Sequence, residues 1–386
     1  MSPRSKQEYL ATISARYQHA SFSEKTRILD EVCVSCGYHR KHAIRRLNRP
    51  YRIRKPVPRK RGKPSVYQHA GVLEPLKRIW LAANLPCSKR LKVLLPLWLP
   101  SYAQEFGRLS CAVQQALDTI SAATIDRLLA PTRSHYRGRG RTTTKPGTLL
   151  RKQIPIQTNQ WDETRPGFLE ADTVAHCGES LLGDFVYTIN FVDLATGWSA
   201  QRAVWGKGET GVLLQIQDVE ATLPFPLRGF DCDNGSEFLN YHLLRHFTQR
   251  AQPIQFTRSR PYHKNDNAHI EQKNWTQVRQ WLGYHRFDNP AVVPLLNQLY
   301  THEWTQFHNF FCPSVKLLEK QLVAGKTIKR YDIPKTPYQR ILESAAVPAA
   351  GKRRLQQQFK TLNPFYLRKR IEQQLKNIFL HQHPPT

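Results

Sequence analysis

The segment 230–275 constrains the fold of this chain more than any other, because it places acidic residues where regular elements begin and end. It opens with Phe-Asp-Cys-Asp-Asn-Gly-Ser-Glu-Phe and closes with Asn-Asp-Asn-Ala-His-Ile-Glu-Gln-Lys-Asn-Trp. The apolar run 227–232 predicts a strand that ends at Asp233, and Gly235 is free to adopt the positive φ of the turn that follows. Ser236 is predicted to cap the next helix.

Two further acidic residues complete a set of three on separate elements. Asp172 lies in the second half of a predicted strand, 169–174, and Glu271 lies early in a predicted helix. Carboxylates are hard oxygen ligands that suit Mg²⁺ or Mn²⁺. Two such ions, roughly 3.5–4 Å apart, can hold both the attacking and the leaving oxygen of a phosphodiester. We therefore expect Asp172, Asp233 and Glu271 to bind two Mg²⁺ (or Mn²⁺) ions, with Asp172 bridging them.

These motifs resemble the catalytic core of retroviral integrases and of the related bacterial insertion-sequence transposases. The resemblance rests on Asp172, on Asp233-Asn-Gly-Ser-Glu-Phe238 and on Glu271 in Asn267-Ala-His-Ile-Glu271, and it covers about residues 166–320. It implies a ribonuclease H-like core in which Asp172, Asp233 and Glu271 are the catalytic residues of a DDE motif. It also implies a transposase that cuts transposon ends and transfers the strands into target DNA.

Two further segments contribute to the resemblance. Residues 192–198, Val-Asp-Leu-Ala-Thr-Gly-Trp, correspond to the turn between the second and third strands, and residues 309–316 follow the core. Between Asp233 and Glu271 there are 37 residues, slightly more than is usual in the family. A longer loop before the helix would absorb the difference.

Other acidic residues compete for the same roles. Glu170 and Asp231 each lie two residues before a chosen acid and share its strand face, because side chains alternate along a strand. Asp266 competes in the same way with Glu271. The family register favours the three acids already named, and a chance grouping among 29 Asp and Glu residues is the remaining alternative.

The charge of the chain indicates a polyanionic partner. Lys and Arg number 58 against 29 Asp and Glu, which gives a net charge of +29. Such an excess predicts strongly salt-dependent binding. We expect double-stranded DNA, both transposon ends and target, bound by a homo-oligomer in a synaptic complex. No apolar run of about 18 residues indicates a membrane span, so we expect a cytoplasmic protein that is nucleoid-associated when bound to DNA.

Residues 1–49 are predicted to form a helix-turn-helix-like DNA-binding domain. The segment 21–24, Ser-Phe-Ser-Glu, has the form of a capping box, and Gly37 is expected to end that helix before the next one, 39–47. The cations expected to face DNA are Arg40, Lys41, Arg45 and Arg46. A plain helical hairpin with a solvated basic face is the alternative.

Four potential zinc ligands recur every three residues in this domain: Cys33, Cys36, His39 and His42. They lie so close in the chain that they could hardly surround one ion tetrahedrally. We therefore expect Cys33 to belong to the core and the histidines to face phosphates, without zinc.

Basic linkers separate the remaining domains. A Pro-rich linker is expected at 50–69, a second helical, DNA-binding domain at 70–131, a flexible linker at 132–165 and a basic C-terminal region at 321–386. The linker cations expected to bind DNA are Arg52, Arg54, Lys55, Arg59, Lys60, Arg61, Arg137, Arg139 and Arg141.

Within the core, the hydrophobic pattern predicts five strands and a crossover helix. A three-strand meander is expected at 169–174, 185–192 and 199–204, then a helix at 209–222, a strand at 227–232 parallel to the first, and a strand at 254–257.

Cations near the predicted acids are expected to meet substrate phosphates. The segment 258–267 is predicted to be a loop that carries Arg258, Arg260, His263 and Lys264. Lys273, on the helix with Glu271, is expected to act in the same way. Trp275, on that helix, is expected to lie in the core, because aromatic residues at helical spacing usually pack there.

The fold class that follows is multidomain α + α/β: a helix-turn-helix-type N-terminal region, a ribonuclease H-like mixed-sheet core and a basic helical C-terminal region. A DDE-type polynucleotidyl transferase is the expected activity. The alternatives are a ribonuclease H-like nuclease and a catalytically dead DNA-binding regulator derived from a transposase.

Overall fold

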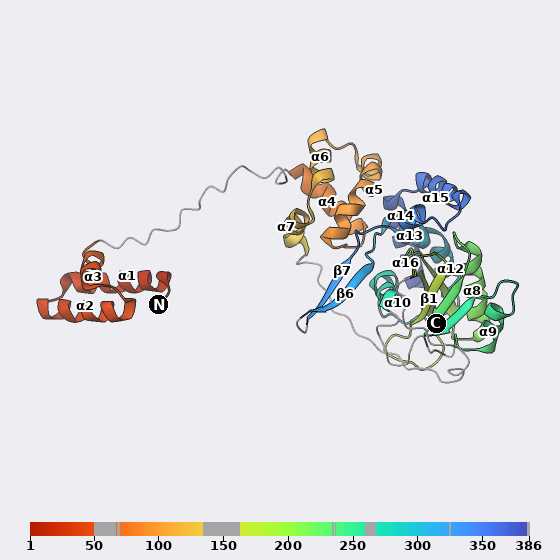
Figure 1. The fold of residues 1–386 in the computed structure, drawn as a ribbon, viewed down its shortest axis with the longest axis horizontal. Coiled ribbons are helices and arrows are strands. Elements are labelled where there is room, and N and C mark those ends of the chain that lie inside the picture. Colours follow the sequence, from red (N-terminus) through yellow and green to blue (C-terminus); the bar gives the residue numbers. More distant parts are fainter. Residues whose placement is uncertain are drawn as a thin grey trace. The chain divides into compact units, whose positions relative to one another are not determined.

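The computed structural model contains two compact units, Met1–Ser65 and Val66–Thr386 (Figure 1). It describes residues 1–49, 67, 70–133, 163–233, 235, 237–258, 268–323 and 326–383. The predicted linkers at 50–69 and 132–165 lie for the most part outside these ranges. None of the described helices is both long enough and apolar enough to cross a bilayer.

The N-terminal unit contains three helices, α1 (Pro3–His19), α2 (Phe22–Cys36) and α3 (Arg40–Leu47). The predicted capping box is confirmed, because the Ser21 side chain accepts from the Glu24 backbone and the Glu24 side chain accepts from Ser21. Gly37 ends α2 in the left-handed conformation, with φ of 63°. The helices pack around their own apolar core.

The four residues considered as zinc ligands have other roles in this unit. Cys36 is fully buried, whereas Cys33 is partly buried and packs against the same core. The Nδ1 of His39 accepts from the Lys41 backbone at the start of α3, and the ring of His42 is exposed.

The large unit is built on a five-stranded mixed sheet in the order β3-β2-β1-β4-β5. The strands are β1 (Phe168–Ala175), β2 (Val186–Asp193), β3 (Ser199–Trp205), β4 (Gly229–Cys232) and β5 (Gln255–Arg258). Strands β1, β2 and β3 form an antiparallel meander, and β4 lies parallel to β1 after the crossover helix α8 (Glu209–Thr222). The predicted meander, helix and parallel strand are confirmed.

Helices cover both faces of this sheet. On one face, Phe230 of β4 stacks on Phe247 of α9 (Tyr241–Thr248), with ring centroids 4.8 Å apart. The other face is covered by a continuous helical stretch that packs over β1 and β2. It comprises α10 (Ala268–Lys273), the π-helical η4 (Asn274–Arg279) and α11 (Gln280–Leu282).

The predicted start of α9 is wrong. The helix begins at Tyr241, and the side chain of Asn240 caps it by accepting from the backbone of Leu243. Residues 237–240 form a turn instead of the first helical turn, so the cap lies four residues after Ser236, the residue predicted for that role.

Two asparagine side chains bind the backbone of β3, the strand at one edge of the sheet. The Ala203 backbone donates to the Oδ1 of Asn297 at 2.7 Å and accepts from its Nδ2 at 2.9 Å. Asn309 makes the same pair of bonds with the Ser199 backbone, at 2.9 and 2.8 Å. Each amide thus replaces a neighbouring strand, and strand β3 presents fewer free backbone groups along its edge.

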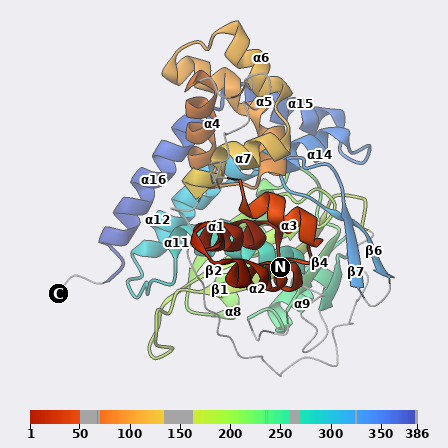
Figure 2. The same ribbon diagram turned by 90° about the vertical axis from the view of Figure 1, so that its left-hand side faces the viewer.

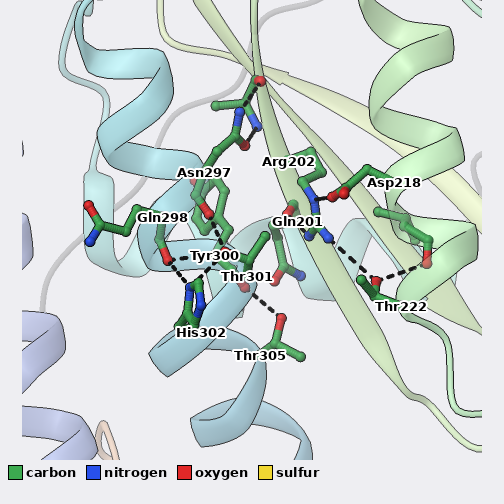
Figure 3. Close-up of polar contacts among 12 residues, drawn as sticks. Gln201, Arg202, Asp218, Thr222, Asn297, Gln298, Tyr300, Thr301, His302 and Thr305 are labelled. Atoms are coloured by element: carbon green, nitrogen blue, oxygen red, sulfur yellow. Dashed lines mark hydrogen bonds and ion pairs between the residues drawn. The ribbon is translucent and has the colours of Figure 1, made fainter.

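These asparagines belong to a helical stretch made of α12 (Val292–Leu299), η5 (Tyr300–Trp304) and α13 (Thr305–Phe311). On the other side of β3, the buried Arg202 donates to Asp218 of α8 at 2.5 Å (Figure 3). Strand β3 is therefore fixed to helices on both sides.

Helices α4 to α7 belong to the large unit. They are α4 (Ala70–Ala82), α5 (Ser88–Phe106), α6 (Cys111–Thr119) and α7 (Ala122–Arg133). Trp98 of α5 is fully buried and donates to the Phe311 carbonyl at 3.3 Å. Its ring also meets Phe365 edge-on, with centroids 5.0 Å apart. These helices thus share one apolar core with the sheet domain.

The predicted helical character of the C-terminal region is confirmed for most of its length. A two-stranded ribbon, β6 (Leu317–Val323) and β7 (Lys326–Tyr331), precedes the helices and spans the predicted boundary at 320. This ribbon was not predicted from the sequence. Three helices follow: α14 (Pro337–Glu343), α15 (Ala349–Thr361) and α16 (Pro364–Leu380). Helix α16 lies beside α12 (Figure 2).

Candidate active site

Two of the predicted acids, Asp172 within β1 and Asp233 directly after β4, lie side by side where the parallel pairing of these two strands ends. In the β1–β4 ladder, Glu170 pairs with Asp231 and Ala171 pairs with Cys232. The next positions along the two strands are Asp172 and Asp233. Neighbouring strands are about 4.8 Å apart, and side chains at the same level of a parallel pair point to the same face. The sheet therefore brings Asp172 and Asp233 together, as the sequence predicts.

Asp172 is held by two hydrogen bonds and has an unusually high pKa. The Thr173 backbone donates to its Oδ1 at 2.7 Å, and the Asn274 side chain donates to its Oδ2 at 2.6 Å. Burial, followed by repulsion from Asp233, raises the pKa of Asp172 to about 7, although both hydrogen bonds act in the opposite direction.

A row of amides fixes the orientation of Asn274. Asn190 of β2 donates to the Oδ1 of Asn274 at 2.9 Å, and Gln201 of β3 donates to the Oδ1 of Asn190 at 2.7 Å. Because the Asn274 carbonyl is occupied, its amide NH₂ is turned toward Asp172. This network links three strands and a helix to one carboxylate, and it was not expected from the sequence.

Asp233 follows the last residue of β4. Its Oδ1 accepts from the Gly235 backbone at 2.9 Å. Burial, then repulsion from Glu237, raises the pKa of Asp233 to about 6, while the Gly235 bond and Lys207 lower it. Both acids thus hold protons more tightly than an exposed aspartate does.

Glu237 is a member of this cluster that sequence reasoning missed. Its side chain is buried, forms an ion pair with Lys207 at 2.6 Å and accepts from Thr173 at 2.8 Å. A Cβ on Gly235 would lie 2.6 Å from the Oε2 of Glu237, so a larger residue at this position would displace the carboxylate. The signal was present in the sequence, because Glu237 belongs to the same Asp-Asn-Gly-Ser-Glu motif as Asp233.

The two competing acids of the strands, Glu170 and Asp231, pair with each other two residues before Asp172 and Asp233. Glu170 and Asp231 are both buried. Asp231 accepts from the Thr257 hydroxyl of β5. Burial, followed by repulsion from Asp231, raises the pKa of Glu170 well above its usual range. These two acids are thus further from solvent than Asp172 and Asp233, and Asp266, the third competitor, lies outside the described residues.

Glu271 lies in the first turn of α10, on the face of the sheet that carries the acids. Its carboxylate is exposed but close enough to Glu170 to raise the pKa of that group. Glu271 and Asn274 are three residues apart, so they lie on neighbouring positions of the helix surface. Among the described residues, no three His, Cys, Asp or Glu side chains meet the geometry of a metal site. The three-acid metal site stays a prediction.

The donor set nevertheless suits a hard divalent cation. Asp172, Asp233 and Glu271 offer only carboxylate oxygens, the ligands that Mg²⁺ and Mn²⁺ prefer. The raised pKa values of Asp172 and Asp233 arise from burial and from repulsion by a neighbouring carboxylate, Asp233 for Asp172 and Glu237 for Asp233. A cation between such groups would oppose both effects. The residues fit the expected ion.

The cations predicted to contact DNA in the N-terminal unit lie on α3. Lys41 and Arg45 are exposed, and Arg46 is partly exposed. Arg40, at the start of α3, forms an ion pair with Asp30 of α2. Most of the other predicted cations lie outside the described residues: Arg52, Arg54, Lys55, Arg59, Lys60, Arg61, Arg137, Arg139, Arg141, Arg260, His263 and Lys264.

Three predictions near the site require correction. Arg258 is the last residue of β5 and its side chain is buried, so it does not begin a loop. Lys273 ends α10 two residues after Glu271, about 200° around a helix, and therefore points away from the acids. Trp275 is 44% exposed and does not belong to the core, because η4 turns it toward solvent.

Fold and site together define a multidomain α/β protein with a carboxylate cluster on two adjacent parallel strands, β1 and β4. The "Uncharacterized protein y4rM" of Sinorhizobium fredii (strain NBRC 101917 / NGR234) is 38% identical over 343 residues, which are 88% of this chain and 96% of the relative. The chain therefore belongs to the same protein family as y4rM.

Two other comparisons add little. No family model matches the chain. Among solved structures, the cryo-EM structure of a simian T-cell lymphotropic virus intasome in complex with PP2A regulatory subunit B56 gamma is similar over 64% of this chain and 76% of that one, at 15% identity. Its TM-score of 0.33 is too low for the similarity to bear on fold or function.

Proposed function

We propose that this protein is a DDE-type DNA transposase with a ribonuclease H-like catalytic core. The observation that carries the proposal is the pair of acids at one level of adjacent parallel strands, Asp172 on β1 and Asp233 after β4. A helix that carries the third acid, Glu271, crosses the same face of the sheet. The antiparallel meander, the crossover helix and the parallel fourth strand agree with the fold that the resemblance implies.

In this proposal Asp172, Asp233 and Glu271 hold the divalent cations. When bound, these ions would polarise the scissile phosphodiester and stabilise the charge that develops on its oxygens. The residues of the chain supply position: Asn274 holds Asp172, and the Gly235 backbone holds Asp233. Lys207 partly balances the negative charge of the cluster through its ion pair with Glu237.

The reaction has two steps, a hydrolysis and a transesterification. Water first cuts the phosphodiester at the transposon end and leaves a 3′ hydroxyl on the transposon strand and a 5′ phosphate on the flanking strand. The 3′ hydroxyl then attacks a target phosphodiester in line and displaces the 3′ oxygen of the target strand. No covalent protein intermediate is required. The net charge of +29 supports DNA as the substrate. Helices α2 and α3 are proposed as a helix-turn-helix that presents Lys41 and Arg45 to DNA, and a homo-oligomer would hold two ends.

Strand transfer in vitro tests the proposal. Purified full-length protein is mixed with labelled duplexes from the DNA that flanks its gene, a target plasmid and Mg²⁺ or Mn²⁺. Joined products are expected from the wild type but not from Asp172→Asn, Asp233→Asn or Glu271→Gln. Asp118→Asn is the matched control, because Asp118 is an exposed acid on α6.

Other results point elsewhere. Strand transfer by the Asp233→Asn variant would show that Asp233 is not a catalytic residue. Preferential cleavage of RNA–DNA hybrids would favour a nuclease, and tight DNA binding without cleavage on any end would favour a regulator.

A further inference from the structure

A second charged site lies on the other side of the helix that carries Glu271. It is a cavity of about 90 Å³ between the start of α5, the α10–η4 stretch and the end of α13. Three cationic or potentially cationic side chains line it: Arg90, Lys273 and His308. No acidic side chain of the described residues lines it.

These three side chains form no hydrogen bond or ion pair with the residues that the structure describes. His308 is 5% exposed, and its Nε2 is buried without a hydrogen bond. Buried polar atoms are almost always hydrogen-bonded, so an orphaned imidazole nitrogen at a cavity wall indicates a ligand position. Neither Lys273 nor Arg90 forms an ion pair with a described residue, and both are half-buried.

The crowding of positive charge is visible in the pKa of His308. Burial, followed by repulsion from Lys273 and Arg368, lowers the pKa of His308 well below its usual range. An anion in the cavity would oppose each of these effects.

We propose that this cavity is a binding site for one phosphate-sized oxyanion, held by the Arg90 guanidinium, the Lys273 ammonium and the His308 Nε2. Arginine and lysine are the usual partners of phosphate oxygens, and an imidazole N–H at Nε2 adds a third donor. The volume suits a small ion, because it is well below that of an engineered apolar cavity of about 150 Å³ that binds benzene.

The same chemistry has two possible sources, a free phosphate ion and a phosphate of the DNA backbone. In either case the anion would connect α5 to the helix that carries Glu271. The second source rests on the proposed function, and there the connection would couple DNA binding to the position of Glu271. The experiment therefore has one arm for each source.

The first arm measures the thermal unfolding midpoint with inorganic phosphate at constant ionic strength. Saturating phosphate is expected to raise the wild-type midpoint by roughly 2–4 °C. The increase should be lost in Arg90→Met and Lys273→Met. Lys89→Met is the matched control, because Lys89 is exposed on the same helix and does not line the cavity. Removal of a half-buried, unpaired charge should not prevent folding.

The second arm measures the affinity of the same proteins for duplex DNA at several salt concentrations, without Mg²⁺. If the ligand is a backbone phosphate, the slope of log K against log salt should fall by about one in Arg90→Met and Lys273→Met relative to Lys89→Met. Either selective change supports the site and identifies the source. Phosphate shifts and salt slopes that match those of Lys89→Met would overturn it. Neither measurement requires catalysis, so the anion site can be tested even if the protein shows no strand transfer.

Discussion

The helix that starts with α10 separates two sites of opposite charge, and they are built in different ways. The acids on its sheet side are adjacent because two parallel strands carry them at matching levels. The basic side chains on its other side come from three helices that are distant in the chain: Arg90, Lys273 and His308. In the first site the backbone ladder enforces the crowding, whereas in the second the apolar packing of helices enforces it. Each site concentrates like charges, and each is therefore suited to an ion of the opposite sign.

The largest expected effect separates the two sites by activity. Asp172→Asn should lower strand transfer by roughly a thousandfold or more, because it removes one of the proposed metal ligands. Lys273→Met should lower it by no more than about tenfold, since that residue points away from the acids. Product formation in single-turnover gels measures both. Equal losses in the two variants would break the distinction between a catalytic site and a separate anion site.

A pair of lysines sharpens the comparison through stability. Lys207→Met should destabilise the fold by about 2–3 kcal/mol, because it leaves the buried Glu237 carboxylate without its ion pair. Lys273→Met should not destabilise it, since that lysine has no pairing partner among the described residues. Chemical denaturation at pH 7 measures the difference. The double variant Lys207→Met/Glu237→Gln should recover most of the loss, and no recovery would show that the ion pair is not the cause.

A smaller effect concerns pH. The pKa of Asp172 is about 7 in the fold, above its unfolded value near 3.9. Its protonation therefore stabilises the fold fully below about pH 4, and this stabilisation is lost as the pH rises through about 7. Asp172→Asn cannot ionise, so without divalent cations its unfolding midpoint should exceed that of the wild type by roughly 2–5 °C at pH 8. The two midpoints should converge at pH 4, and a constant difference across the range would show that ionisation of Asp172 is not the cause.

The smallest effect is expected at Trp275, which lies on the helix between the two sites but is 44% exposed. Trp275→Ala should cost less than about 1 kcal/mol, whereas truncation of a fully buried tryptophan such as Trp304 typically costs about 3–5 kcal/mol. Urea unfolding of both variants compares them. A large loss at Trp275 would restore the core position that the sequence predicts.

The acid side of this comparison could be predicted from the sequence, and the cation side could not. Alternation and an Asn-Gly turn locate Asp172 and Asp233 at strand ends, because these signals are local. The amide row through Asn190 and Asn274 and the cavity around His308 depend on contacts between distant segments, for which the sequence contains no spacing rule. Glu237 is an intermediate case. The sequence shows that it belongs to the same motif as Asp233, but its ion pair with Lys207 depends on the turn after β3, which the sequence does not place.

The two asparagines that bind the edge of β3 lie far downstream in the chain, and this affects the strand during synthesis. Asn309 follows Ser199 by 110 residues in the chain, and Asn297 follows Ala203 by 94. At a synthesis rate of about 5–20 residues per second, a nascent chain would carry this strand with its edge uncovered for roughly 5–20 s. During that interval, two neighbouring nascent chains could pair through β3. Slower translation between residues 203 and 309 should therefore lower the yield of monomeric product.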